Sequence, residues 1–237
     1  IQTDFEQAYA NGSVQIYFSS DYESIDRVEF YESTTMLGSE MNYPFDFRVD
    51  NLPFGTHNIY AKIFSGEEYG ISNFLTIIVG EQIAYENVPY DIPGILEPGK
   101  YDSFQGGLGQ NISYFDSSID NKGNYRSTEF VDVEFSSEDE GPTLGWIEAG
   151  EWLEYSITVS EPAFYDLSYR FSSGNSSPSG GFYFEIDGIK VSEDIYPGVS
   201  GDWNNWLSGS TGNIELNAGE HTLRLVLLEG GFNLGRM

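Results

Sequence analysis

The chain has 237 residues and carries 38 acidic against ten basic side chains, a formal net charge of −28. A phosphate-rich partner would be repelled, because no basic surface exists to release its counterions, so the charge excludes nucleic acid. Cysteine is absent, which excludes disulfides, a thiolate nucleophile and zinc–thiolate sites. No apolar run approaches the roughly 20 residues of a membrane-spanning helix, and we expect no membrane segment.

Ile1 does not begin a signal peptide, and the abrupt ends at Ile1 and Met237 favour a segment of a longer chain. A strongly acidic chain suits a salty environment, where screening limits self-repulsion, and this favours a marine source.

The composition favours strands over helices. Aromatic residues make up 16% of the chain and glycine contributes 27 residues, which supply a core and turns. No stretch of ten or more residues has the apolar spacing of an amphipathic helix. The sequence therefore predicts an all-β fold, and the strand pattern divides it into two β-sandwiches.

The first 80 residues contain short β-rich segments separated by turn sequences. Five to seven such strands in about 80 residues are typical of an Ig-like sandwich. Residues 26–31, 44–47 and 52–57 resemble bacterial Ig-like domains, and the resemblance implies a spacer between the modules of a secreted enzyme. We therefore assign residues 1–80 to an N-terminal Ig-like β-sandwich. Its predicted strands are 13–18, 27–31, 45–49, 57–64 and 73–79.

Residues 81–93 are predicted to form a linker. Pro89 and Pro93 lie within five residues, and the apolar spacing is irregular, which suggests a short, stiff connection. A second series of strands follows, and about ten strands in residues 94–237 fit a C-terminal jelly roll. The predicted strands include 144–147, 152–159, 165–171, 182–187, 214–216 and 221–228.

The tryptophans point to a type of ligand. A polysaccharide presents flat C–H faces and a rim of hydroxyls, so proteins bind it with aromatic planes and planar polar groups. Trp146 precedes a short turn, and Trp203 falls in a loop of Gly, Ser and Asp where large apolar side chains are normally avoided. Trp152 and Trp206 stand at predicted strand starts and are more typical of a core.

Six motifs occur in order and together resemble a family 6 carbohydrate-binding module. This family is a β-jelly roll appended to polysaccharide-degrading enzymes, and the resemblance spans residues 92 to 237. The motifs are 92–101 (IPGILEPGKY), 113–116 (SYFD), 124–126 (NYR), 145–152 (GWIEAGEW), 201–206 (GDWNNW) and 231–234 (GFNL).

The resemblance implies a cleft among loops at one end of the sandwich. Trp146 and Trp203 would hold a sugar between them, and Asn233 would form hydrogen bonds to it. Asp116 is the nearest candidate for an acidic residue that reads a chain-end hydroxyl, and Tyr114 lies beside it. Core packing is the alternative role for both tryptophans, and a turn cap is the alternative for Asn233.

The resemblance also implies two further features. A second cleft on the concave sheet face would use Trp152. Many family members hold a structural calcium with a Glu-x-Glu pair and a late Asp, but here the pair reads Glu97-Pro-Gly99 and Gly235 stands at the late position. Calcium takes six to eight oxygen ligands. We therefore expect the calcium site to be absent or altered, with Glu97 the remaining ligand candidate, and no cofactor to be required.

Paired carboxylates allow a catalytic alternative. Glu148 and Glu151 are the obvious candidates for a glycosidase pair, but they flank a turn within a family motif. The acidic run at 137–141 is typical of a solvated loop. His57 and His221 fall at predicted strand starts, with no serine partner visible. The sequence therefore predicts that this region is not an enzyme.

We predict that the chain targets an attached glycoside hydrolase, agarase or porphyranase in type, to a neutral algal polysaccharide. Residues 97–102, 113–116 and 232–237 resemble modules of marine agarases and porphyranases, so agarose comes first. Laminarin or another β-glucan, and then xylan, are alternative ligands. A cell-surface adhesin fragment and a small lyase or hydrolase are alternative functions. We expect a secreted or extracellular monomer whose partners are a polysaccharide or oligosaccharide and a catalytic domain in the same parent chain.

Overall fold

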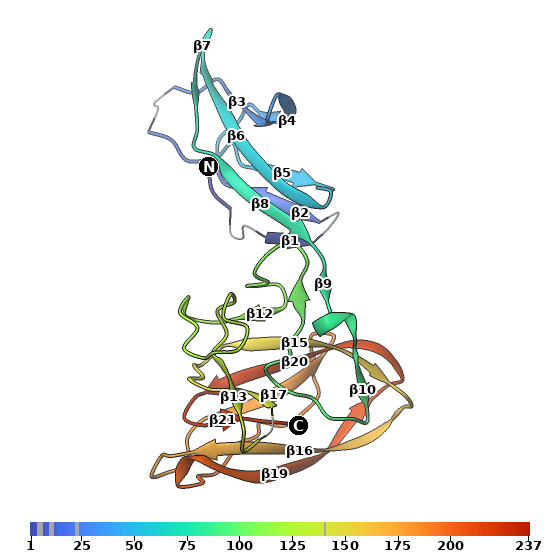
Figure 1. Ribbon diagram of the computed structural model, residues 1–237. Coiled ribbons are helices and arrows are strands. Elements are labelled where there is room, and N and C mark those ends of the chain that lie inside the picture. The colour runs from blue at the N-terminus through green and yellow to red at the C-terminus, as the bar shows by residue number, and fades with distance from the viewer. Residues whose placement is uncertain (4–6, 10–11, 22–23, 140) are drawn as a thin grey trace. The chain divides into compact units, whose positions relative to one another are not determined.

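The computed structural model describes residues 1–3, 7–9, 12–21, 24–139 and 141–237 (Figure 1). This part of the chain contains no α-helix and one 3-10 helix, Tyr85–Asn87, so the predicted all-β class is confirmed. No helix there is long and apolar enough to cross a membrane. The chain divides into two compact units, residues 1–82 with 104–107 and residues 83–103 with 108–237.

The first unit contains two sheets. The described residues form a sheet with the order β1-β8-β6-β3-β4, in which β7 also pairs with β6, and a separate pair of β2 with β5. Alternation along β6 buries Ile59 and Ala61 against Val28, Phe30 and Ile77. The strands are β1 (Gln7–Tyr9), β2 (Ser13–Ile16), β3 (Arg27–Glu32), β4 (Thr35–Glu40), β5 (Phe47–Asp50), β6 (Gly55–Ser65), β7 (Glu68–Ile71) and β8 (Leu75–Gly80).

The stretch predicted as a linker, 81–93, has strands at both ends. β9 (Gln82–Ile83) pairs with β11 (Ser103–Phe104). β10 (Tyr90–Ile92) lies parallel to β15 (Trp152–Val159), with Tyr90 opposite Ile157. Tyr90 and Ile92 also pack against the core of the second unit. Most of the stretch, from Ile83 onwards, therefore belongs to the second unit.

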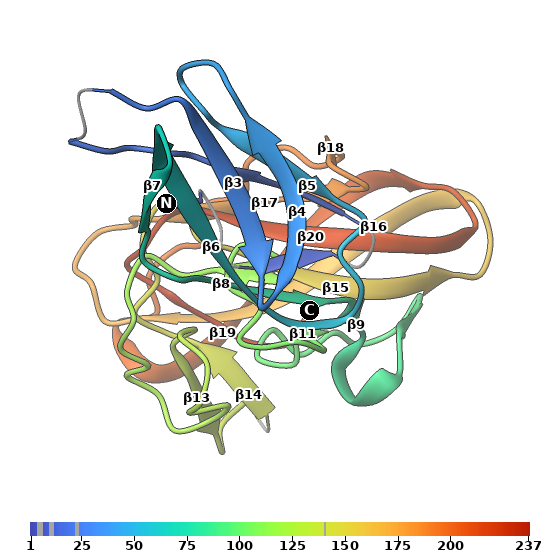
Figure 2. The same ribbon diagram turned by 90° about the horizontal axis from the view of Figure 1, so that it is seen from above.

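The described residues of the second unit form two main sheets, with the orders β10-β15-β20-β17-β18 and β13-β14-β21-β16-β19. β12 also pairs with β15, and the long pairs β15–β20 and β16–β19 are antiparallel. The β15 and β20 ribbons run side by side in Figure 1 and Figure 2. Tyr155, Phe182 and Leu225 are among its fully buried core side chains. The remaining strands are β12 (Tyr114–Phe115), β13 (Val133–Ser136), β14 (Gly141–Leu144), β16 (Ala163–Ser173), β17 (Gly181–Ile186), β18 (Ile189–Lys190), β19 (Asp202–Leu216), β20 (Gly219–Glu229) and β21 (Asn233–Leu234).

Two strand predictions in this unit need correction. The predicted strand 144–147 is wrong, because β14 ends at Leu144 and Trp146 has a left-handed backbone with φ of 46°. The predicted strand 214–216 is the end of a much longer one, since β19 begins at Asp202. β19 is largely exposed over its first residues, so the buried alternation that marks a strand appears only near its end.

Candidate functional site

A cavity of about 320 Å³ opens in the second unit beside β13, β14, β19 and β21. All four strands belong to the sheet that also contains β16, yet they come from distant parts of the sequence. The cavity brings together Trp146, Trp203 and Asn233. Its lining is Glu134, Trp146, Ile147, Trp203, Gly231, Phe232 and Asn233.

Trp146 is turned outwards by its backbone. Its φ of 46° is unusual for a bulky residue and breaks the β alternation directly after β14. Its neighbour Ile147 is buried, whereas Trp146 is 46% exposed. The following turn is fixed because Glu148 N donates to Glu151 Oε2 at 2.9 Å. Glu151 therefore holds the Trp146 turn, which is a structural role for one carboxylate of the suggested catalytic pair.

Trp203 is the second residue of β19 and is 44% exposed. Its carbonyl oxygen accepts a hydrogen bond from Ser172 Oγ at 2.6 Å. Its indole lies against Gly174, where a Cβ atom would stand only 2.5 Å from Nε1. Gly174 thus leaves room for the indole, and the Trp203 backbone is anchored to β16.

Asn233 lies between the two segments that carry the tryptophans. It begins β21 and stands opposite Ser172 in the pairing with β16. Its Nδ2 donates to Ser172 Oγ at 3.3 Å. Its Oδ1 faces Gly145, where a Cβ atom would come within 3.3 Å. An amide group therefore stands in the cavity, with its nitrogen bound to Ser172 and its oxygen facing a glycine that has no side chain.

Glu134 and Phe232 line the cavity without having been identified from the sequence. Glu134 lies on β13 opposite Thr143 of β14, and its side chain is partly exposed. Phe232 is only 1% exposed and packs into the core beneath the cavity. Glu134 sits in a generally acidic stretch, so only the pairing of β13 with β14 distinguishes it from other acidic residues. The cavity thus combines two exposed indoles with an amide and a carboxylate.

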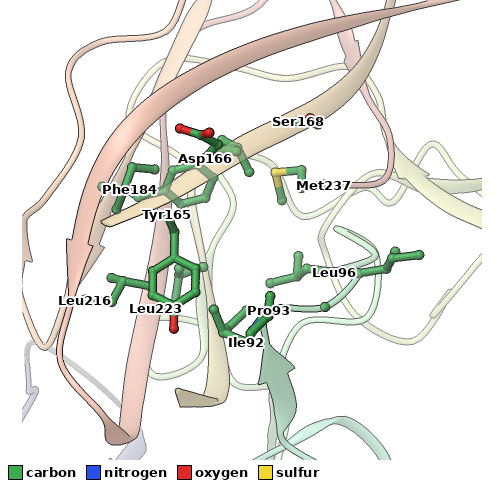
Figure 3. Close-up of a pocket in the computed structure, with 14 residues that line it drawn as sticks. Ile92, Pro93, Leu96, Tyr165, Asp166, Ser168, Phe184, Leu216, Leu223 and Met237 are labelled. Atoms are coloured by element: carbon green, nitrogen blue, oxygen red, sulfur yellow. The ribbon is translucent and has the colours of Figure 1, made fainter. Parts of the chain in front are cut away.

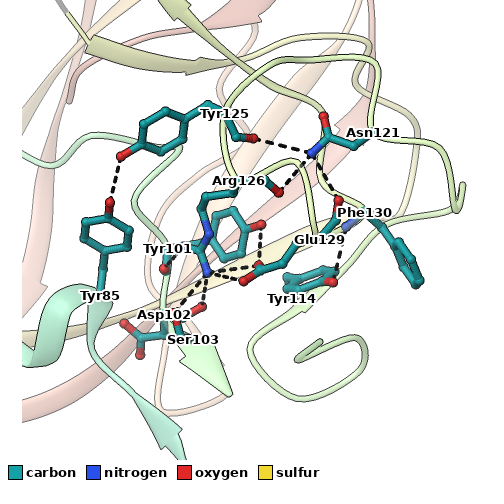
Figure 4. Close-up of polar contacts among 10 residues, drawn as sticks. All are labelled: Tyr85, Tyr101, Asp102, Ser103, Tyr114, Asn121, Tyr125, Arg126, Glu129 and Phe130. Atoms are coloured by element: carbon teal, nitrogen blue, oxygen red, sulfur yellow. Dashed lines mark hydrogen bonds and ion pairs between the residues drawn. The ribbon is translucent and has the colours of Figure 1, made fainter. Parts of the chain in front are cut away.

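The structure gives Tyr114 no surface that a ligand could contact, because its side chain is fully buried. Burial raises the pKa of Tyr114 well above its ordinary value, and its hydroxyl accepts a hydrogen bond from Phe130 N at 3.4 Å. Its ring stands edge-on to Tyr101, 5.3 Å away. Arg126 and Glu129 bind each other beside this pair at 2.9 Å (Figure 4). Tyr114 is therefore a core residue next to a partly buried ion pair.

Asp116 does not line the cavity either. It is only 4% exposed, and its Oδ1 accepts hydrogen bonds from Ser118 N at 2.8 Å and Ser118 Oγ at 3.1 Å. Burial raises the pKa of Asp116, and the negative charges of Asp132 and Glu148 add to the effect. The carboxylate therefore fixes the turn of its own loop, and the structure gives it no place beside Trp146 and Trp203.

Trp152 lies on β15, in the other sheet, and its side chain is half-buried. The Arg224 guanidinium stands over its ring at 4.1 Å and also binds Glu154 Oε1 at 2.6 Å. Trp206 packs beside Gly235, where a Cβ atom would come within 2.9 Å of its ring. Neither residue lines the cavity with Trp146 and Trp203.

The residues at the expected calcium position do not fit that ion. Glu97 Oε2 is bound by the Lys100 ammonium, so its charge is already neutralised. A side chain at Gly235 would collide with Asp139, whose fully buried carboxylate accepts hydrogen bonds from Arg170 Nε at 3.0 Å and Arg236 N at 2.9 Å. Calcium needs mostly carboxylate oxygens, and in the part of the chain described these carboxylates are bound by lysine and arginine.

A second cavity of about 360 Å³ has a different character (Figure 3). Aliphatic side chains dominate it, and Asp166 and Ser168 provide its few polar groups. The Tyr165 hydroxyl donates to Glu161 O at 2.7 Å. The cavity has no indole and no amide side chain, so it lacks the combination of groups that marks the first cavity. Its lining includes Ile92, Pro93, Leu96, Leu167, Phe184, Ile214, Leu216, Leu223 and Met237.

One family model matches part of the second unit. Residues 123–237 match the family model described as carbohydrate binding module (family 6). No curated protein matches the chain.

Solved structures similar to the chain include three modules of that family. One is the C-terminal family 6 module of LamC, a marine laminarinase from Zobellia galactanivorans, with 26% identity, 45% of this chain and 84% of that chain covered, and a TM-score of 0.41. A second, from Cellvibrio mixtus lichenase 5A in complex with cellotriose, has 27% identity, coverage of 45% and 82%, and a TM-score of 0.40. A third, from Clostridium stercorarium in complex with cellobiose, has 18% identity, coverage of 63% and 94%, and a TM-score of 0.46.

The ordered motifs and the family model therefore agree over the region that carries Trp146, Trp203 and Asn233. Residues 123–237 of this chain form a carbohydrate-binding module of family 6.

Proposed function

We propose that the second unit binds a neutral polysaccharide in the cavity between Trp146 and Trp203. The observation that carries the proposal is the meeting of two half-exposed indoles with the Asn233 amide in one cavity of about 320 Å³. Indole faces cover the C–H surface of a pyranose, and the amide and the Glu134 carboxylate bind its hydroxyls. A cavity of this size takes one or two sugar rings directly.

Charge favours a neutral polymer over a sulfated or uronate-rich one. The chain carries a net charge of −28, and the cavity itself contains the Glu134 carboxylate and no basic side chain. An anionic sugar would meet repulsion at long range and again within the site. Agarose is therefore our first candidate, with laminarin or another β-glucan and then xylan as the alternatives.

The proposed role is to deliver a catalytic domain to its substrate. A binding module that holds a polymer raises the local concentration of that polymer for an enzyme in the same parent chain. The parent would be a secreted glycoside hydrolase of the agarase or porphyranase type from a marine source. The first unit would be an Ig-like spacer, and the chain would act as a monomer.

Binding to a panel of polymers tests this proposal. Affinity electrophoresis through gels with agarose, laminarin, xylan, porphyran, carrageenan or alginate should show retardation by a neutral polymer, and calorimetry should give its affinity. Retardation only by the anionic polymers would contradict the charge argument, and retardation by none would contradict carbohydrate binding. New reducing ends or unsaturated products would contradict a purely non-catalytic role.

A second cleft on the sheet face remains a proposal, supported by one feature. Trp152 is flanked there by Arg224 and Glu154, which offer hydrogen-bond donors and acceptors beside an indole. If this face binds sugar, Trp152→Ala should remove one of two sites in a titration and leave the Trp203 site unchanged. A single site that survives Trp152→Ala would rule this cleft out.

A further inference from the structure

Two serines at the end of β16 are buried beside the cavity, with Ser172 at 0% and Ser173 at 1% exposure. Their hydroxyls bind the segments that carry the cavity lining. Ser172 Oγ donates to the Trp203 carbonyl at 2.6 Å and accepts from Asn233 Nδ2 at 3.3 Å. Ser173 Oγ donates to the Gly231 carbonyl at 2.7 Å. The sugar-facing groups are thus anchored on hydroxyls that do not line the cavity.

The single hydroxyl proton of Ser172 determines the direction of its hydrogen bonds. A serine hydroxyl has a single proton, and a backbone carbonyl has none. The short contact with the Trp203 carbonyl therefore takes the only proton of Ser172, whose oxygen must then accept from Asn233. The amide nitrogen of Asn233 consequently faces Ser172, and this assignment does not depend on telling nitrogen from oxygen by position.

The other side of the Asn233 amide is then an acceptor. Its Oδ1 points towards Gly145, and the missing Cβ of that glycine leaves the oxygen uncovered. We propose that Ser172 is a positioning residue of the sugar site, which turns the Asn233 Oδ1 towards a sugar hydroxyl and couples that amide to the Trp203 backbone. This inference rests on the proposed function of the cavity.

The pairing of β21 with β16 does not involve the Ser172 hydroxyl. β21 pairs with β16 through its backbone, with Phe171 opposite Leu234 and Ser172 opposite Asn233. The strand register therefore does not depend on the Ser172 side chain. Removing the hydroxyl should free the Asn233 amide to rotate and leave the fold in place.

Calorimetry with laminarihexaose, cellohexaose, xylohexaose and neoagarohexaose tests the proposal. The unsubstituted protein first identifies which of these sugars binds. Ser172→Ala should weaken the binding of that sugar by about 3- to 10-fold, which is the effect of one neutral hydrogen bond. Ser156→Ala is the matched control, because it also removes a serine hydroxyl that forms a hydrogen bond. Ser156 lies on β15, and its Oγ donates to Asp102 Oδ2 at 2.7 Å. This variant should bind the sugar as tightly as the unsubstituted protein does. In an Asn233→Ala background, Ser172→Ala should add less than its separate effect, whereas full additivity would overturn the coupling.

Asn233→Asp tests the proton count. A carboxylate keeps two acceptor oxygens for the sugar, yet it has no proton to give Ser172 and competes with Trp203 for the serine proton. The variant should therefore bind at least as weakly as Asn233→Ala, and parent-like affinity would overturn the proposal.

A ligand-free measurement keeps the two proposals apart. The side-chain amide protons of Asn233, observed by NMR without sugar, should shift towards free-asparagine values in Ser172→Ala and stay unchanged in Ser156→Ala. Unchanged Asn233 signals in Ser172→Ala would overturn the positioning role. If the unsubstituted protein binds none of the four sugars, the proposed function is overturned. The NMR signals would still decide whether Ser172 orders the Asn233 side chain.

Discussion

Replacing Trp203 by alanine should remove most of the affinity for a polysaccharide. The side chain is 44% exposed, which leaves on the order of 110 Å² of its surface open, since aromatic side chains present up to about 250 Å². A pyranose ring that covers half of this area loses a similar area of its own, so about 100 Å² of largely apolar surface leaves water. At about 25 cal/mol per Å², this contributes about 2–3 kcal/mol. The dissociation constant should therefore rise about 30- to 150-fold.

Calorimetry with the tightest-binding neutral polymer, supported by affinity electrophoresis, measures this change. Phe164→Ala is the matched control, because Phe164 is 64% exposed on β16 and lies outside the cavity lining. It should bind as the parent does, and thermal melting should show that both variants are folded. If Trp203→Ala binds within twofold of the parent, the stacking argument and the assignment of the cavity are both refuted.

The contacts of Glu97, His221 and Tyr114, outside the cavity, have measurable consequences. Melting in EDTA and in calcium should give the same Tm, because Lys100 already neutralises Glu97; a rise of several degrees with calcium and not magnesium would contradict this. The hydrogen bond with Asp187 raises the pKa of His221 above 6.5, and the same bond lowers the pKa of Asp187 below 3.8. This ion pair therefore stabilises the fold between pH 3.8 and 6.5. The contribution is lost as the pH rises through the raised pKa of His221. His221→Gln should thus lower the free energy of unfolding by about 0.5 kcal/mol at pH 5.5 and by almost nothing at pH 9 in urea titrations, whereas a pH-independent loss would oppose this account. Tyr114→Phe should keep full affinity and cost less than about 1 kcal/mol of stability, and weakened binding would return Tyr114 to the site.

The strand pattern was accessible from the sequence where one face of a strand is buried. β6, β15 and β20 each contain buried side chains at alternate positions, and their predicted ranges overlap the observed strands. The start of β19 was missed because its first residues are mostly exposed on both faces. The predicted strand through Trp146 failed because a left-handed φ interrupts it, and no residue type in the motif requires that conformation.

The site could be predicted only in part from the sequence, for similar reasons. Trp146, Trp203 and Asn233 are conspicuous as exposed-loop candidates, and the structure brings them to one cavity. Tyr114 has the same composition signal as a binding tyrosine, but its pairing with Leu153 of β15 places it in the core. Ser172 carries no signal at all, because a buried serine acquires its role only from the two groups that meet it.

The central claim is that a sugar occupies the cavity between Trp146 and Trp203. Indole N–H signals of the four tryptophans, recorded by ¹⁵N NMR during titration with the sugar that binds, test it most directly. Signals of Trp146 and Trp203 should shift together and saturate at one concentration, while that of Trp206 stays in place. A titration in which only Trp152 shifts, or in which no indole responds to a sugar that calorimetry shows to bind, would contradict the account.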